Sequence, residues 1–471
     1  MGFGTLLEKL IEIAMIPKTD FAISVDMTPS ALSKILSGKR LPFYKDKKIF
    51  TKKAASCLAQ EIYKDKCYLK FESVFPVIYN FNISYELEAF LSDAIDYHLT
   101  KEYAVENNDN TDYPSKEISI LGKKQILNMF CIIISDAISS SSSPLEIFSS
   151  VHTLFYRLNS DVLNRIRIIR LRNPQRKITL NHFFDMPFLE NAFNIQNMDL
   201  FSYIVKAHRH FDLNLWQVEN EIYGNFFLLK NNFLLVFNTQ IDGTLLMTII
   251  RHKSYLSTFF NTIIKKDARN ISYTTDEASA LVESDSSTAA IRRLLDNPID
   301  AVYNFTSLGY LVKKEDLMPF PASAAIKDFM LKLFDNVLTK DTTFYVTIEA
   351  MTSFFATGKV IVPLIGAVEI ERDKRIPYLE RFNNYLQKKS HDKIKIITND
   401  PPKVSMISLK GLSILYIVDN EYKNERFHCF ETDVINSRLH DAILNDTIKI
   451  LDFTPDLWSL YIDEMTDNLP Y

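Results

Sequence analysis

The chain has 471 residues, of which 47% are hydrophobic and 24% are charged, a composition that excludes a mainly disordered protein and suffices for several folding units. Its net charge of −4 is uneven, because residues 1–53 hold ten Lys and Arg against five Asp and Glu. A basic head on an acidic body favours a small nucleic-acid-binding domain joined to a part that does not contact nucleic acid.

Cysteine usage and apolar runs indicate a cytoplasmic protein. The four cysteines are scattered without a CxxC pair, which is typical of reduced thiols. No signal peptide is visible at the N-terminus. The longest apolar run, Ile126–Ile138, is interrupted by Asn128 and Asp136 and is shorter than the ~20 residues of a membrane-spanning helix. We therefore expect no membrane partner.

Three short helices are predicted over residues 5–38. Leu7, Leu10, Ile11 and Ala14 have the spacing of one helix face, and Pro17 ends that helix. A second helix is expected over residues 21–25. Asp26 and Met27 form the turn, and the third helix ends at residue 37. Its expected start and stop signals are Thr28 as N-cap, Pro29 at the first helical position and Gly38 at the end.

The segment from Phe21 to Pro42 resembles the lambda-repressor-like (XRE-type) helix-turn-helix domain of bacterial regulators. The matching features are the pair Phe21-Ala22, the turn at residues 26–27, the capped third helix and the closing residues 38–42. Two positions depart from the family pattern: Asp26 stands at the usual turn glycine, and Leu36-Ser37 replaces the usual acidic residue. The resemblance implies an all-α DNA-binding domain, which we place at residues 1–70.

The resemblance also implies which residues contact double-stranded DNA. The recognition helix of the family lies in the major groove with its N-terminal residues at the base edges. Side chains after that helix contact phosphate, which positions the protein without reading sequence. The candidate DNA-binding residues are Lys18, Thr19, Thr28, Pro29, Ser30, Ser33, Lys34, Lys39 and Arg40. The alternative is a capped helical hairpin with solvated lysines, or a head of this type that binds a protein.

The next segments are predicted to be helical. Residues 44–64 are expected to close the first domain, with a basic cluster of Lys45, Lys47, Lys48, Lys52 and Lys53 that either follows DNA backbone or is a solvated face. Residues 71–143 are expected to be a helical linker or dimerisation region with helices at 85–107 and 118–138. Their alternative is a simple helical core. The serines at 139–143 suggest a linker.

The remainder is interpreted as two tandem α/β modules, residues 144–275 and 324–471, joined by a mostly helical connector at 276–323. Residues 147–158 and 326–337 are both expected to be helical, each followed by a short β-like run. The segments 228–238 and 408–418 both suggest a hairpin. Identical residues recur at an offset of 180: Leu229/Leu409, Lys230/Lys410, Leu235/Leu415, Ser257/Ser437 and Ile263/Ile443. The expected fold class is thus α+β and multidomain, with a divergent repeat that would create a cleft between its modules.

Residues with catalytic or metal-binding spacing are not found. The motifs GxxxxGK[ST], GxGxxG, GxSxG and HExxH are absent. The pairs His208/His210 and His428/Cys429 lack further metal ligands at a suitable spacing. A run of basic residues suggests either an anion-binding surface or an ion-paired strand: Arg165, Arg167, Arg170, Arg172, Arg176 and Lys177. We expect no enzyme activity, no metal and no cofactor.

The leading hypothesis is a sequence-specific transcriptional regulator. It would bind a pseudo-palindromic operator as a homodimer, with the C-terminal modules responding to a small-molecule or peptide effector. The first alternative is a protein-interaction scaffold of a mobile element or phage-related system. The second is an enzyme whose helix-turn-helix head is autoregulatory.

Overall fold

The fold is described from a computed structural model, and it divides into two compact units. The first contains residues 1–183, 210–212 and 221–268, and the second contains residues 184–209, 213–220 and 269–471. The described residues are 1–64, 68–71, 73–106, 118–141, 144–150, 166–168, 178–185, 204–205, 207–209, 211–218, 224–265, 268–284, 291–307, 309–339, 341–388, 393–398, 404–419, 424–445, 450–452, 456, 459–460 and 463–464.

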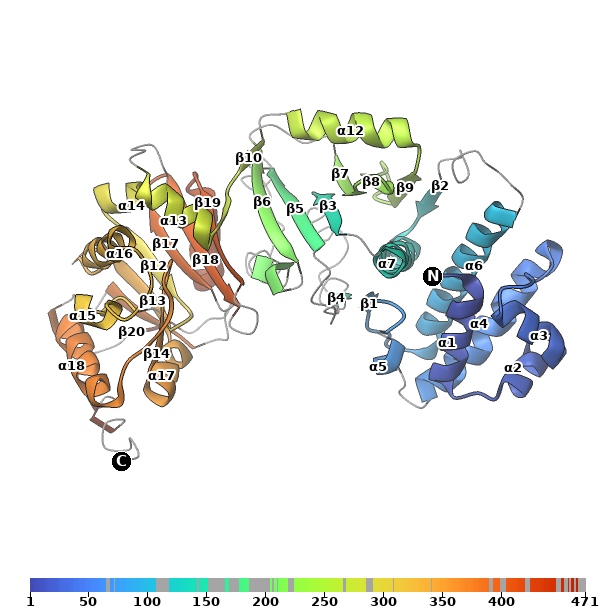
Figure 1. Ribbon diagram of the computed structural model, residues 1–471, viewed down its shortest axis with the longest axis horizontal. Coiled ribbons are helices and arrows are strands. Elements are labelled where there is room, and N and C mark those ends of the chain that lie inside the picture. The colour runs from blue at the N-terminus through green and yellow to red at the C-terminus, as the bar shows by residue number, and fades with distance from the viewer. Residues whose placement is uncertain are drawn as a thin grey trace. The chain divides into compact units, whose positions relative to one another are not determined.

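Helices form the N-terminal part of the first unit (Figure 1). In chain order they are α1 (Phe3–Ala14), α2 (Lys18–Ser24), α3 (Pro29–Leu36), the 3-10 turn η1 (Tyr44–Asp46), α4 (Lys47–Lys64), α5 (Tyr68–Phe71) and α6 (Ser84–Glu106). The predicted apolar face of α1 is buried, with Leu7, Leu10, Ile11 and Ala14 each at most 2% exposed. Helix α1 packs against α3, α4 and α6, so α6 belongs with the head rather than with a separate linker.

The end of α3 comes unusually close to α1. A Cβ atom on Gly4 of α1 would lie 2.5 Å from the carbonyl oxygen of Ile35 and 2.6 Å from that of Leu36. Since both opposing atoms are backbone, only glycine fits at this contact. The position of α3 on the head is therefore set by a direct helix–backbone contact.

Residues 118–141 differ from the prediction of one helix at 118–138. Strand β2 (Ile118–Leu121) comes first, Gly122 follows with φ of 90°, and helix α7 is Lys123–Ser140. The helix includes the first two residues of the serine run, so the linker predicted there does not begin at residue 139. Asn128 and Asp136, which interrupt the apolar run, are both buried in α7.

An eight-stranded mixed sheet follows, with strand order β10-β6-β5-β3-β7-β8-β9-β2. Its strands are β3 (Leu145–Ser149), β5 (Ile178–Asp185), β6 (Asp212–Val218), β7 (Asn225–Leu229), β8 (Phe233–Thr239), β9 (Leu245–Ile250) and β10 (Ala268–Asn270), besides β2. Residues 213–218 of β6 and residues 269–270 of β10 cluster with the second unit. A separate pair joins β1 (Val77–Tyr79) to β4 (Ile166–Ile168).

Two helices pack on this sheet from opposite sides. Helix α12 (Lys253–Lys265) contacts β7 through Phe259 and Phe226, whose ring centroids are 5.2 Å apart. Helix α7 contacts the next residue of β7, with the rings of Phe130 and Phe227 5.3 Å apart. Successive side chains of a strand point to opposite faces, so α12 and α7 cover different faces of the sheet.

The second unit contains another eight-stranded sheet, of order β11-β19-β18-β17-β12-β13-β16-β20. The strands are β11 (Ser272–Thr274), β12 (Ala301–Asn304), β13 (Thr343–Thr347), β16 (Ile394–Ile397), β17 (Ser405–Leu409), β18 (Leu412–Asp419), β19 (Asn424–Phe430) and β20 (Ile450–Asp452), with a hairpin of β14 (Lys359–Val362) and β15 (Gly366–Glu369). The helices are α13 (Thr275–Glu283), α14 (Arg293–Asp296), α15 (Lys314–Leu317), α16 (Ala324–Val337), α17 (Ile348–Thr357), α18 (Arg372–Lys388) and α19 (Val434–Asn445).

Helices again occupy both faces of the second sheet. Helices α13, α14 and α16 share one apolar core with the strands (Figure 1), including Val282, Leu294 and Phe334. On the other face, Tyr303 of β12 donates a hydrogen bond to Asn436 of α19 over 3.0 Å. The core of this unit is therefore built on both sides of its central strands.

The two sheets have the same strand order when read in sequence. Each sheet has a first strand that is followed by a helix, β2 by α7 and β11 by α13. The next strand, β3 or β12, is central and pairs in parallel with β5 or β13, respectively. On its other side the central strand pairs antiparallel with the first strand of a hairpin, β7 or β17. The hairpins β7–β8 and β17–β18 turn at Asn231 and Gly411, both with positive φ and 180 residues apart.

Two predicted elements differ from the structure. Residues 147–149 lie in β3, not in a helix, so the expected helical match between 147–158 and 326–337 fails; residues 151–158 lie outside the described part. The expected helical connector at 276–323 contains β12, a central strand of the second sheet. No helix in the described ranges is long and apolar enough to cross a membrane.

Candidate nucleic-acid interface

Helices α2 and α3 are joined by the short turn that the sequence predicts. Asp26 has φ of 53°, a left-handed conformation that Asp tolerates better than most residues. The Thr28 side chain caps α3 by accepting a hydrogen bond from the backbone N–H of Ala31 over 3.2 Å, and Pro29 is the first helical residue. Gly38 follows the helix with φ of 70°. The start, turn and end signals therefore lie where they were expected.

The inward faces of α2 and α3 are apolar. Val25, Leu32 and Ile35 are at most 4% exposed, and Met27 is half-buried. These residues lie on the inner side of the head. Their burial leaves the outward face of α3 to polar side chains.

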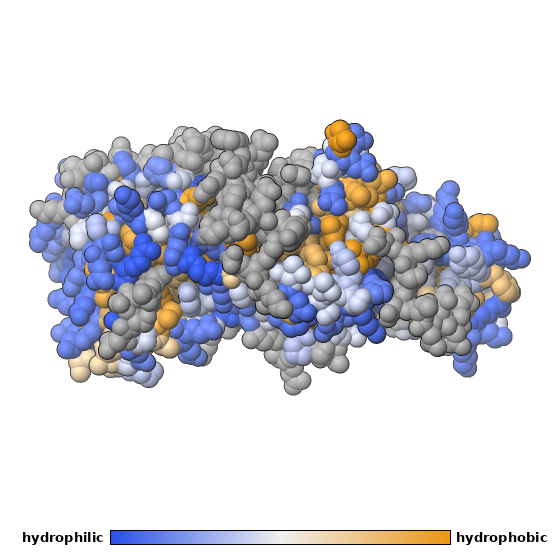
Figure 2. All heavy atoms as spheres, turned by 90° about the horizontal axis from the view of Figure 1, so that it is seen from above, coloured by the Kyte–Doolittle hydropathy of each residue, from blue (hydrophilic) through white to orange (hydrophobic). Residues whose placement is uncertain are grey.

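All nine candidate DNA-binding residues are exposed. They come from the first turn of α2, the outward face of α3 and the segment directly after α3: Lys18, Thr19, Thr28, Pro29, Ser30, Ser33, Lys34, Lys39 and Arg40. Figure 2 shows hydrophilic residues over most of the coloured surface of the N-terminal helices, at the right-hand end of the view. The fold thus brings short polar side chains and cations together along one continuous stretch of chain.

The cations of this surface differ in how they are engaged. Within the described part of the chain, Lys34, Lys39 and Arg40 have no carboxylate at ion-pair distance, and the Arg40 guanidinium lies 4.4 Å from the centre of the Phe43 ring. Lys18, in contrast, donates a 2.6 Å hydrogen bond to Glu8, which raises the pKa of Lys18. Lys34, Lys39 and Arg40 are therefore better placed to meet an external anion than Lys18.

The basic cluster of α4 is divided in the same way. Lys47 lies 2.8 Å from Asp96, and Lys53 pairs with Asp26 in the α2–α3 turn. Lys45, Lys48 and Lys52 are exposed. Lys47 and Lys53 thus form ion pairs within the head, which neither reading of the cluster predicted, and the other three lysines are exposed.

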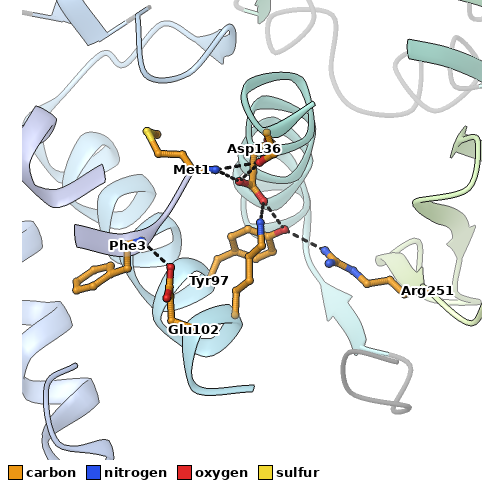
Figure 3. Close-up of polar contacts among 8 residues, drawn as sticks. Met1, Phe3, Tyr97, Glu102, Asp136 and Arg251 are labelled. Atoms are coloured by element: carbon orange, nitrogen blue, oxygen red, sulfur yellow. Dashed lines mark hydrogen bonds and ion pairs between the residues drawn. The ribbon is translucent and has the colours of Figure 1, made fainter. Parts of the chain in front are cut away.

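A buried polar cluster centres on Asp136 of α7 (Figure 3). Its carboxylate accepts hydrogen bonds from Lys101 of α6 over 2.6 Å, from Tyr97 over 3.3 Å and from the Met1 amino group over 3.3 Å. Arg251, just after β9, donates to the Tyr97 hydroxyl over 2.9 Å. The cluster links α6 of the head to α7 and to the end of the first sheet.

The charges in this cluster control its titration. Burial alone would raise the pKa of Asp136, but the positive charges of protonated His98, of Lys101 and of the amino group hold that pKa below its usual range. Burial lowers the pKa of His98, which is 2% exposed, to about 4. At neutral pH the cluster therefore contains an ionised carboxylate and a neutral imidazole. Sequence reasoning missed it, although an Asp within an apolar run was its signal.

The histidines singled out in the sequence do not form a metal site in the part described. His428 is buried in β19, and the Ser272 hydroxyl lies 2.8 Å from its Nδ1. Burial, then the charges of His208 and Arg426, lower the pKa of His428 well below its usual range, so it is neutral. No group of three or more His, Cys, Asp or Glu among the described residues is arranged to hold a metal ion.

The arginine run is largely outside the described residues. Arg167 lies in β4, where it pairs in register with Ile78 of β1. His210 and the other members of the run fall outside: Arg165, Arg170, Arg172, Arg176 and Lys177.

Neither the protein-family models nor the curated proteins contain a match to this chain.

Proposed function

We propose that the chain is a sequence-specific DNA-binding regulator that reads the major groove with α3. The observation that carries this proposal is the exposure of all nine candidate contact residues, on and beside a helix, α3, whose other face is buried. An eight-residue helix that is capped at its start and held by Gly4 at its end presents a fixed polar face. Fixed geometry of this kind is what base readout requires.

The residues of this surface have two distinct roles in the proposal. Ser30 in the first turn of α3, and Ser33 and Lys34 in its last turn, are exposed, and Ser and Lys side chains can hydrogen-bond base edges. Lys39 and Arg40 follow the helix and contact phosphates, which supplies affinity without sequence preference. The ring of Phe43 beneath Arg40 orients that guanidinium.

The body of the chain is proposed to be a tandem repeat. The shared strand order, the helices on both faces and the two left-handed turn residues at Asn231 and Gly411 support a duplication. In the proposal the repeats dimerise the chain and respond to an effector, because a single head contacts too few base pairs for useful specificity.

A second candidate function is protein docking by the same head. Ile23, Phe43 and Tyr44 of the head are 71%, 60% and 74% exposed, so their apolar area is available to a partner. A partner protein bound there would cover apolar area rather than neutralise phosphate charge. Salt dependence separates the two functions, since binding through several phosphates weakens steeply with salt and an apolar contact does not.

Variants of the two residue classes test the proposal. Ser30→Ala with Lys34→Ala is expected to remove the preference for the selected duplex over random duplex while the head stays folded. Unchanged selectivity with an intact circular dichroism spectrum would refute groove readout by α3. Lys48→Ala is the matched control, because Lys48 is an exposed lysine of the same head outside α3.

A further inference from the structure

One end of the first sheet is uncovered on the face that carries α12. Phe226 of β7, whose ring contacts α12, is the register partner of Val236 in β8. Val236 pairs with Thr248 of β9, and Thr248 pairs with Ser119 of β2. Cross-strand partners share one face of a sheet, so this row leads from the strand under α12 to the last strand, β2 (Figure 1).

Exposure rises along this row and along its neighbour. Phe226 is fully buried, whereas Leu121 of β2 is 49% exposed. Six side chains of the two rows are exposed or half-buried, and we call them the β2–β9 face: Ser119, Leu121, Val236, Asn238, Leu246 and Thr248. The face thus combines aliphatic groups with the hydroxyls of Ser119 and Thr248, which lie 3.4 Å apart, and it carries no charge.

The second sheet has a corresponding row, which is buried. It contains Leu415 of β18, His428 of β19 and Ser272 of β11, and all three are at most 3% exposed. His428 lies 180 residues after Thr248, the offset that also relates the two hairpin turns. The Ser272 hydroxyl lies 2.8 Å from Nδ1 of His428, as the Ser119 hydroxyl lies near that of Thr248. The same position in the fold is therefore closed in one sheet and open in the other.

An earlier part of the same chain closes this row in the second unit. The backbone N–H of Leu215 in β6 donates to the Ser272 hydroxyl over 2.5 Å. The ring of Phe184 lies 5.8 Å from that of Phe430, which is two residues after His428 and so shares its face of β19. Leu215 and Phe184 both belong to the second unit and are themselves buried. The chain before β2 forms the helical head instead, and it leaves the β2–β9 face exposed.

We propose that the β2–β9 face is a dimer interface, on which the same face of a second copy of this chain packs about a two-fold axis. The occupant is this chain because the corresponding face of the second sheet is closed by this chain's own residues. In a two-fold interface each patch meets an identical patch, so a surface with charge of one sign would repel itself. The uncharged β2–β9 face avoids that repulsion, and its aliphatic groups gain from leaving water. DNA would instead require cations on this face.

The interface deepens the proposed function, because it rests on the dimer that the proposal includes and names the surface that forms it. It does not rest on DNA binding. A chain that selects a DNA motif but stays monomeric would overturn the interface alone, whereas a dimer that selects no motif would overturn only DNA readout.

Sedimentation velocity of the full chain without DNA, over a range of concentrations, tests the interface. We expect a monomer–dimer equilibrium for the wild type. Leu121→Glu is expected to weaken dimerisation about 100-fold, because the two-fold axis brings two introduced carboxylates into an apolar interface. Ile118→Glu is the matched control, since Ile118 lies in the same strand with 42% exposure but on the opposite face, and we expect it to dimerise as the wild type does.

A second variant of the same face keeps the test independent of folding. Ser119→Glu serves if circular dichroism shows that Leu121→Glu does not fold, because Ser119 is exposed on the β2–β9 face. A wild-type chain that is monomeric at every concentration would overturn the proposal, as would a dimer that both variants leave unchanged. Equal weakening by Ile118→Glu and Leu121→Glu would overturn the face and indicate pairing along the edge of β2. Growth beyond a dimer with concentration would overturn the two-fold arrangement.

Discussion

Substituting Gly4 by alanine tests whether α1 holds α3 in place. The added Cβ would lie 2.5 Å and 2.6 Å from the carbonyl oxygens of Ile35 and Leu36, at the end of α3. Carbon–oxygen contacts need roughly 0.8 Å more than this, and a backbone atom cannot rotate away as a side chain does. The two helices must therefore separate.

The expected magnitude follows from two opposed effects. Alanine within a helix gains about 1 kcal/mol over glycine. Overpacking costs about 1–3 kcal/mol, and the upper end applies because both opposing atoms are backbone. We expect a net loss of about 2 kcal/mol, which corresponds to about 30-fold faster hydrogen exchange in α3 by local opening.

Hydrogen exchange measured by mass spectrometry on peptides covering α3 is the assay. Gly2→Ala is the control, because its Cβ would meet only the Glu102 carboxylate oxygen at 3.2 Å, and we expect a loss of about 0.5 kcal/mol there. Exchange in α3 that is unchanged or slower in Gly4→Ala would refute the contact as the determinant of the α3 position.

Three further predictions concern the head. The double variant Lys39→Ala with Arg40→Ala is expected to weaken binding to all duplexes, and to lower the slope of log affinity against log salt concentration by about 2. Fluorescence anisotropy measures both effects. A loss of affinity confined to one DNA sequence would contradict a phosphate role. Asp26→Gly should be about 1 kcal/mol more stable than Asp26→Ala to urea, because φ is 53° there. The pKa of His98 is about 4 in the folded chain and about 6.5 when unfolded, so the unfolded state binds the proton first as pH falls. Between pH 6.5 and 4, hydrogen-exchange protection of α6 should therefore fall by about 3 kcal/mol more in the wild type than in His98→Gln. Parallel pH profiles of the two proteins would contradict this.

The head was the most predictable part of the fold. Its helices are indicated by residues close together in sequence, namely the apolar spacing in α1, the cap at Thr28 and the glycine at 38. The structure has a helix start or end at each of these signals. The exposure of the candidate DNA-binding residues followed from the same spacing. The contact at Gly4 could not be predicted, because it depends on how two helices approach each other.

The sheets were less predictable, because strand partners are distant in sequence. A hairpin was predicted correctly in residues 228–238 and 408–418, and the offset of 180 holds at Leu229/Leu409 and Lys230/Lys410, the last strand residues and the first turn residues. In the next strand, β8 or β18, the offset is 179, and in β9 and β19 it returns to 180, where Ile249 corresponds to Cys429. The first hairpin has one more turn residue, so the register equates Leu235 with Ile414 rather than with Leu415. Strand β12 was missed, because its four residues carry too short a pattern to identify.

The β2–β9 face and the Asp136 cluster could not be read from sequence either, since each gathers side chains from separate elements. Leu121 and Val236 have no sequence relation that suggests one face. Asp136 was recognisable as a polar residue in an apolar run, but its partners Lys101 and Met1 lie 35 and 135 residues away. Only the tertiary fold brings such groups together.

Selection of bound duplexes from a random DNA pool by the full chain tests the central claim most directly. The account predicts enrichment of a two-fold symmetric motif at moderate salt, and loss of that enrichment in Ser30→Ala with Lys34→Ala. A folded chain that enriches no motif at low salt would contradict DNA readout by α3.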